Sequence, residues 1–324
     1  MLIAAAAILV GFIILIWSAD LFIAGAASIA ESMGMSPIII GLTIVSLGTS
    51  APEVLVAFIA TMSDAGNLAI GNAIGSNIAN IGLVLGISLL VIPMCVHRSC
   101  MRQEMPVLLT VTCGVGFLLL DGELSRLDGY LMMGALILLL SQMVRSQVRD
   151  SIISEEAEDE PLPHLPLGRA KLTFLLGLAL LIASSRLLVW GAVEIAEQLG
   201  VSQLIIGLTI VAVGTSLPEL AATIASALRG HAEIALGNVI GSNLFNLLAV
   251  MAIPGIVAPE VLEPDVLSRD YLAMTALTVF LAVAIYISRR GGKAPPDHAY
   301  LGRSMGVVLV SFYAMYYYWL YLTI

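Results

Sequence analysis

The chain has 324 residues, of which 59% are hydrophobic and only 11% are charged. A soluble domain carries roughly 25% charged residues, so this composition excludes a soluble globular fold and predicts an integral membrane protein. The formal net charge of −9 has a meaning only after the charges are assigned to the two sides of the membrane.

Long apolar runs recur along the whole chain. A helix needs about 20 mostly apolar residues to cross a bilayer, and the runs are nearly unbroken, which favours helices over the alternating strands of a β-barrel. We therefore predict an all-α integral membrane protein with about ten transmembrane helices. In chain order the expected spans are 2–29, 37–63, 67–93, 104–120, 127–147, 170–196, 203–228, 233–257, 270–288 and 304–323.

The basic residues predict the orientation of these spans. If the first span starts outside the cell, most of the 14 Lys and Arg residues fall on one common side, which is then cytoplasmic. We expect a multi-pass protein of the cell (inner) membrane with both termini outside. Asp20 and Arg186 then lie toward opposite sides of the membrane, so no ion pair between them is expected.

The chain consists of two similar halves. Ile40–Glu53 returns as Ile206–Glu219, and Gly71–Asn80 returns as Gly237–Asn246, at one offset because 219 − 53 = 166 and 246 − 80 = 166. Five spans per half is an odd number, so the second half enters the bilayer from the opposite side, as in many secondary transporters. The expected division is a first repeat at 1–148, an acidic cytoplasmic linker at 149–169, and a second, inverted repeat at 170–324.

Each half carries Gly-Thr-Ser-x-Pro-Glu in the middle of an apolar span, ending at Glu53 and at Glu219. A carboxylate at the centre of a membrane helix costs about 2.5–3.5 kcal/mol and an internal proline about 3 kcal/mol, so two copies cost roughly 10 kcal/mol. A purely structural purpose does not account for that penalty. Pro52 and Pro218 should break both helices and leave carbonyl oxygens free to bind a cation.

Polar side chains repeat around these glutamates. Thr and Ser precede each glutamate by four and three residues, and the second repeated block places Asn, Ser and Asn at intervals of four, so each group shares a helix face. Any single member could instead serve helix packing, and the glycines of the second block, Gly71, Gly75, Gly237 and Gly241, should allow close helix approach. The expected cluster comprises Thr49, Ser50, Glu53, Asn72, Ser76, Asn77, Asn80, Thr215, Ser216, Glu219, Asn238, Ser242, Asn243 and Asn246.

This cluster offers oxygen atoms and neither Cys nor His. Hard cations such as calcium take six to eight oxygen ligands, whereas zinc and copper sites favour Cys and His. The residues therefore predict a site for a hard cation, with Glu53 and Glu219 as its charged metal ligands.

The paired motifs resemble the alpha repeats of the sodium/calcium exchanger family within the cation/calcium antiporters, over nearly the whole chain and closest to its compact prokaryotic members. The resemblance implies a secondary antiporter, not an enzyme, that exchanges sodium for calcium by alternating access without a cofactor. The implied partners are small inorganic cations and the lipid bilayer, with no nucleic acid and no obligate protein partner. The implied calcium ligands are Glu53, Glu219, Thr49 and Thr215. The implied sodium ligands are the same side chains with Ser50, Ser76, Ser216 and Ser242, and the backbone near Ser46 and Ala212.

Some family members carry Asp where this chain has Asn246, which leaves the sodium stoichiometry and any potassium dependence open. Proton-driven exchange of calcium or another cation is an alternative, because protons neutralise the same glutamates, and a cation channel is a more distant one. An intramembrane hydrolase is disfavoured because the spans contain neither a Ser/His pair nor a His-rich motif.

The first and sixth spans are rich in Gly and Ala and carry none of the central ligands, so we expect them to be the moving parts.

Overall fold

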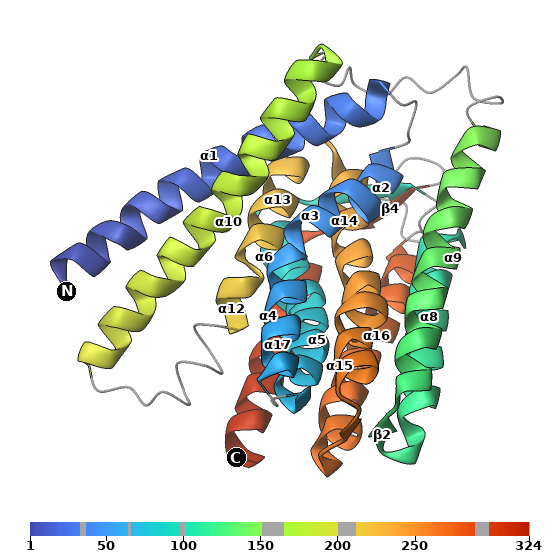
Figure 1. Cartoon of the computed structure of the whole chain (residues 1–324). Helices are drawn as coiled ribbons and strands as arrows, with labels where there is room; N and C mark the ends of the chain where they lie inside the picture. Colours follow the sequence, from blue (N-terminus) through green and yellow to red (C-terminus); the bar gives the residue numbers. More distant parts are fainter. Residues whose placement is uncertain are drawn as a thin grey trace.

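The computed structural model describes residues 1–32, 37–63, 66–97, 102–150, 165–199, 212–288 and 298–323. These residues form a bundle of long helices with two short β-ribbons (Figure 1). Within these described residues, seven helices are long and apolar enough to cross a membrane, or up to eight if one bent pair counts as a single span. The all-α, multi-pass membrane fold is therefore confirmed, while the number of ten spans stays a prediction.

The uninterrupted helices coincide with long apolar runs that contain no proline beyond the first helical turn, where Pro106 lies in one of them and is tolerated. They are α1 (Leu2–Ser32), α8 (Glu104–Leu118), α9 (Arg126–Asp150), α10 (Leu167–Gln198), α16 (Leu272–Ser288) and α17 (Arg303–Thr323). A 3₁₀ turn at Leu119–Asp121 extends α8, and a π-helical turn, η6 (Val266–Tyr271), precedes α16. The ends of the expected linker belong to α9 and α10, and its residues 151–164 lie outside the described residues.

The remaining expected spans are interrupted helices. The second comprises α2 (Pro37–Ile40), the π-helical turn η1 (Gly41–Val45), α3 (Ser46–Thr49) and α4 (Ala51–Met62); the third comprises α5 (Gly66–Ala79), η2 (Asn80–Leu85) and α6 (Gly86–Val91). In the second half the counterparts are α12 (Ala212–Thr215), α13 (Leu217–Leu228), α14 (Ala232–Phe245), η5 (Asn246–Val250) and α15 (Ala252–Val257). The start of the expected span 203–228 falls outside the described residues. The wide turns η2 and η5 begin at repeat-equivalent asparagines, and such turns are frequent at functional sites.

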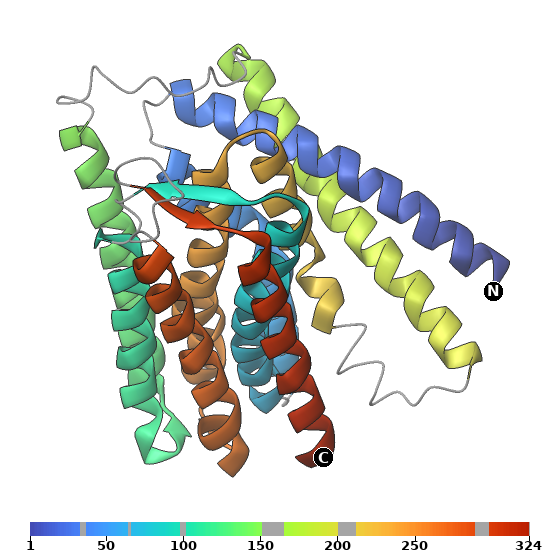
Figure 2. The same cartoon turned by 180° about the vertical axis from the view of Figure 1, so that it is seen from behind.

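Two antiparallel ribbons mark opposite ends of the bundle, and the sequence analysis did not predict them. Strand β1 (Met94–His97) pairs with β4 (His298–Leu301), and β2 (Glu123–Leu124) pairs with β3 (Glu260–Val261). Figure 2 shows the β1/β4 ribbon at the end of the bundle away from the C-terminus. We call the two ends of the molecule the β1/β4 end and the β2/β3 end.

Helices α1 and α10, which are equivalent in the two halves, run antiparallel and lie side by side, inclined across the rest of the bundle (Figures 1 and 2). Their contacts repeat the internal offset. A Cβ on Gly25 would lie 2.9 Å from the carbonyl oxygen of Ala170, and a Cβ on Gly191 would lie 2.7 Å from that of Ala4. Since 25 + 166 = 191 and 170 − 166 = 4, these are the same contact made twice, so the inverted relation of the halves is visible in the packing.

Candidate functional site

Both motif-bearing helices break at the serine of the motif. Ser50 has φ −82° and ψ 5°, and Ser216 has φ −88° and ψ 2°, so each caps the start of a new helix with a proline in its first turn. The two pieces of the first broken span are bent by 49°. The predicted breaks are therefore confirmed. They place Glu53 and Glu219 in the first turns of α4 and α13, where the positive end of the helix dipole favours a carboxylate.

The break in the second half releases a backbone carbonyl that another helix uses. Pro218 has no amide hydrogen to donate to the oxygen of Gly214, four residues earlier. Instead Ser185 on α10 donates its hydroxyl to that oxygen at 2.8 Å. The repeat position of Ser185 is 185 − 166 = 19, an alanine, so this hydrogen bond belongs to the second half alone.

The two halves meet at the paired glutamates. Ser50 Oγ donates to Glu219 Oε1 at 3.0 Å, and Thr49 Oγ1 donates to Asn238 Oδ1 at 3.2 Å. Glu53 and Glu219 are each only 1% exposed. Ser50 precedes Glu53 by three residues, so its hydrogen bond to Glu219 joins the two acidic motifs directly. Oppositely inserted copies of one motif thus bring two acidic groups together in the interior.

The asparagines of the second repeated block form a further junction between the halves. Asn80 Nδ2 donates to Asn243 Oδ1 at 3.1 Å, and Asn77 Nδ2 donates to the backbone oxygen of Asn243 at 3.3 Å. Asn77 also lies 3.4 Å from the sulfur of Met274 on α16. All three asparagines are buried. Amide groups from α5, η2 and α14 therefore hold the two motif-bearing halves in register.

Many oxygen atoms of this region have no hydrogen-bond donor. A buried oxygen that lacks a partner loses about 1–3 kcal/mol relative to one that is paired. Within the described residues, the unpaired buried oxygens of the cluster are Glu53 Oε2, Asn77 Oδ1, Asn80 Oδ1, Ser216 Oγ, Glu219 Oε2, Ser242 Oγ and Asn246 Oδ1. The set is rich in carbonyl, carboxyl and hydroxyl oxygens, which are the ligands that hard cations bind.

The other predicted ligands contribute less. Ser76 is buried, whereas Asn72 and Thr215 are only partly buried. The backbone oxygen of Ser46, proposed as a ligand, accepts from the amide of Ser50 at 2.9 Å, and the Ser46 hydroxyl donates to Leu42. Ala212 begins α12, and the placement of its side chain lies outside the described part of the chain.

Sequence reasoning missed Thr223. Its side chain is fully buried, and its hydroxyl accepts from Asn238 Nδ2 at 2.9 Å, while the same amide group lies 3.3 Å from the backbone oxygen of Glu219. The signal was present, because Thr223 follows Glu219 by four residues and shares its helix face. It was overlooked because the equivalent position, 223 − 166 = 57, is an alanine.

The predicted glycine contacts hold in one half. A Cβ on Gly41 would lie 2.9 Å from Gly237 Cα, and a Cβ on Gly241 would lie 2.6 Å from the backbone oxygen of Leu42, so η1 packs directly on α14. A Cβ on Gly71 or Gly75 would meet nothing described within 4 Å. The segment equivalent to η1 falls at 207–211, outside the described residues, so close approach at Gly71 and Gly75 stays a prediction.

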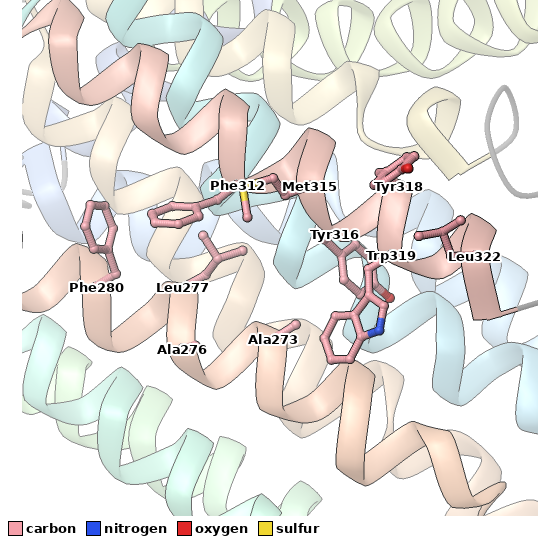
Figure 3. Close-up of a pocket in the computed structure, with 10 residues that line it drawn as sticks. All are labelled: Ala273, Ala276, Leu277, Phe280, Phe312, Met315, Tyr316, Tyr318, Trp319 and Leu322. Atoms are coloured by element: carbon pink, nitrogen blue, oxygen red, sulfur yellow. The ribbon is translucent and has the colours of Figure 1, made fainter.

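An apolar groove lies apart from this cluster, between α16 and α17. It has a volume of about 420 Å³ and is lined by aromatic and aliphatic side chains such as Phe280, Phe312 and Trp319 (Figure 3). A surface of this kind suits contact with lipid chains. Among the described residues, the side chains that line it include no Asp, Glu, His or Cys.

Known proteins share this architecture. A family model described as sodium/calcium exchanger protein matches residues 3–144 and 170–322. The chain is 45% identical to a putative antiporter, CaxA, of Alkalimonas amylolytica, covering 90% of this chain and 92% of the relative. It is 30% identical to the sodium/calcium exchanger MaX1 of Methanosarcina acetivorans, covering 95% and 96%. The solved structure of the sodium-calcium exchanger NCX_Mj is similar with a TM-score of 0.78 and 29% identity, covering 96% of each chain. The chain therefore belongs to the sodium/calcium exchanger family and is a multi-pass cation/calcium antiporter.

Proposed function

We propose that this antiporter exchanges sodium for calcium, and that both ions bind between Glu53 and Glu219. The observation that carries the proposal is the convergence of unpaired buried oxygens from both halves around these two carboxyl groups. Calcium takes six to eight oxygen ligands, carboxylates among them. The sodium/calcium exchanger MaX1 and the exchanger NCX_Mj, to which the chain is similar, carry these two ions in their names.

The charge of the site explains why transport would be coupled. Two ionised glutamates give an empty site a charge of −2, and burying each charge costs several kcal/mol. One calcium ion or two or more sodium ions offset that charge. The protein therefore changes conformation readily only when loaded, which produces exchange rather than leakage. Asn246 stands where some family members carry Asp, so the site has two carboxylates rather than three. Few sodium ions are therefore needed to neutralise it.

The two ends of the bundle support the proposed orientation. At the β2/β3 end, the N-terminal amino group donates to Gln198 at 3.0 Å, and Arg269 donates to Thr323 at 3.0 Å. The β1/β4 end carries the ribbon between the third and tenth spans. We assign the β1/β4 end to the cytoplasm with the 149–169 linker, and both termini to the outside, because the basic residues are enriched toward the β1/β4 end of the expected topology.

We assign the motion to α1 and α10, which pack on each other through main-chain contacts at Gly25 and Gly191. Polar contacts among the described residues connect the pair to the rest of the bundle. Ser185 on α10 donates to Gly214, and Asp20 on α1 pairs with Arg229 after α13 at 2.5 Å. Asp20 is thus held by a residue of the β1/β4 end and not by Arg186.

The decisive experiment is uptake of labelled calcium into proteoliposomes. An outward-directed sodium gradient should drive uptake in the wild type, and a pH gradient alone should not. Glu53→Gln and Glu219→Gln should each reduce uptake to background without loss of expression. Glu260→Gln, at the β2/β3 end and outside the cluster, serves as the matched control and should retain uptake. Uptake driven only by the pH gradient would favour proton-coupled exchange, and unchanged uptake in both glutamate variants would remove these residues from the site.

A further inference from the structure

We propose that Thr223 is a positioning residue for cation binding, which fixes the amide of Asn238 and, through it, the hydroxyl of Thr49. Thr223 lies on α13 and is fully buried. Its Oγ1 accepts from Asn238 Nδ2 at 2.9 Å. Asn238 Oδ1 in turn accepts from Thr49 Oγ1 at 3.2 Å, which brings in the first half of the chain. The inference rests on the proposed function, because it assigns how one oxygen of that same site is oriented.

The orientation of the Asn238 amide follows from a neighbour that can only accept. The backbone oxygen of Glu219 lies 3.3 Å from Asn238 Nδ2, and a carbonyl oxygen has no hydrogen to donate. The NH₂ group therefore faces α13, and Thr223 gives its second hydrogen an acceptor. A reversed amide would place its oxygen against the carbonyl oxygen of Glu219 and lose these bonds. The amide oxygen is thus held toward Thr49.

The held amide oxygen determines where the hydroxyl hydrogen of Thr49 points. Thr49 is fully buried, so this hydrogen needs an acceptor within the protein. The backbone oxygen of Ser46 lies 3.4 Å from Thr49 Oγ1 but already accepts from the amide of Ser50 at 2.9 Å. Asn238 Oδ1 is the nearer acceptor. A cation repels a hydroxyl hydrogen and attracts the lone pairs, so a hydrogen held by Asn238 leaves Thr49 Oγ1 free to bind an ion at the glutamates.

The first half of the chain differs at the key position. The residue equivalent to Asn238 is Asn72 (238 − 166), and the residue equivalent to Thr223 is Ala57 (223 − 166). Alanine has no hydroxyl to accept a hydrogen bond. In the part of the chain that the structure describes, the buried Asn72 Nδ2 has no partner. Fixing of the amide by a threonine is therefore a property of the second half and is not a by-product of the duplication.

The test measures calcium binding to the folded protein. Full-length protein in detergent is dialysed against labelled calcium without sodium, after gel filtration has selected the folded fraction. Thr223→Val, which removes the hydroxyl at nearly constant volume, should weaken calcium binding about tenfold, the size expected for the loss of one buried hydrogen bond. Thr223→Ser keeps the acceptor and should bind within about twofold of the wild type. If Thr223→Val does not fold, Thr223→Ala takes its place.

The matched control is Thr61→Val. Thr61 is also a buried threonine, and it donates to the backbone oxygen of Ala57 on its own helix at 2.7 Å. It follows Glu53 by eight residues, about 12 Å along α4 at 1.5 Å per residue. Its variant should bind calcium like the wild type. Equal weakening in Thr61→Val and Thr223→Val, or equal weakening in Thr223→Val and Thr223→Ser, would overturn the positioning role.

A double-mutant cycle separates positioning through Thr49 from a general loss of packing. Thr49→Ala should weaken calcium binding, and adding Thr223→Val to it should weaken binding no further, because the hydroxyl that Thr223 orients is already gone. Additive losses would overturn the connection through Thr49.

The glutamate variants distinguish this inference from the proposed function. Loss of calcium binding in Glu219→Gln, together with wild-type binding in Thr223→Val, would overturn the role of Thr223 alone. Calcium binding that persists in both Glu53→Gln and Glu219→Gln would overturn the proposed function itself.

Discussion

Replacing Ser50 with alanine should destabilise the ion-free protein, whereas the same change at its repeat counterpart, Ser216, should not. Ser50 Oγ donates to Glu219 Oε1 at 3.0 Å, and both residues are 1% exposed. Ser50→Ala therefore leaves a buried carboxyl oxygen without its donor. Ser216 Oγ has no partner among the described residues, so its removal costs no hydrogen bond.

The magnitude follows from the kind of hydrogen bond that is lost. A hydrogen bond to a charged group contributes about 1.5–3 kcal/mol. For a chain of this size, 1 kcal/mol shifts the midpoint of thermal unfolding by roughly 2 °C. We expect Ser50→Ala to lower Tm by about 3–6 °C and Ser216→Ala to lower it by about 1 °C or less.

The assay is thermal unfolding in detergent, followed by intrinsic tryptophan fluorescence, with a calcium chelator present and sodium replaced by choline. In saturating sodium, Ser216→Ala should also have a lower Tm than the wild type, because the wild type has an oxygen ligand for sodium that this variant lacks. Equal Tm losses for the two variants in the ion-free buffer would refute the assigned asymmetry between the serines.

Two further predictions use contacts outside the ion cluster. Gly241→Ala should sharply reduce the yield of folded protein, because a Cβ there would lie 2.6 Å from the backbone oxygen of Leu42. Gly134→Ala on the exposed face of α9, where a Cβ would meet nothing described within 4 Å, should express normally. Gel filtration of both variants checks this, and equal yields would contradict the packing of η1 on α14. Asp20→Asn removes an ion pair between side chains that are 54% and 31% exposed, which is worth about 0.2–1 kcal/mol, so the exchange rate should change by no more than about 5-fold. High salt should shrink that difference, and a rate change that is insensitive to salt would point away from the ion pair.

The sequence predicted the parts of the fold that local chemistry determines. Unbroken apolar runs become α1, α10 and α17 within a few residues of the expected bounds. The breaks at Ser50 and Ser216 follow from the prolines two residues later, which cannot continue the hydrogen-bonding pattern of the preceding turn. The repeat offset of 166 residues also indicated that the two motifs face each other.

Other features depend on contacts between distant segments and left no local signal. The β1/β4 ribbon joins residues about 200 positions apart, and neither strand is long or strongly alternating. The hydrogen bond from Ser185 to Gly214 requires knowledge of how α10 lies against the broken helix.

The glycine contacts between α1 and α10 have a consequence for leakage. At Gly25 and Gly191 the partner's backbone leaves no room for a Cβ, so a lengthwise slip of one helix against the other would bring bulkier residues into collision at both places at once. The pair that we propose as the moving part is therefore expected to move as one rigid body. In that scheme, a rigid body that uncovers the glutamates toward one face of the membrane covers them toward the other, which opposes a continuous water-filled path across the protein.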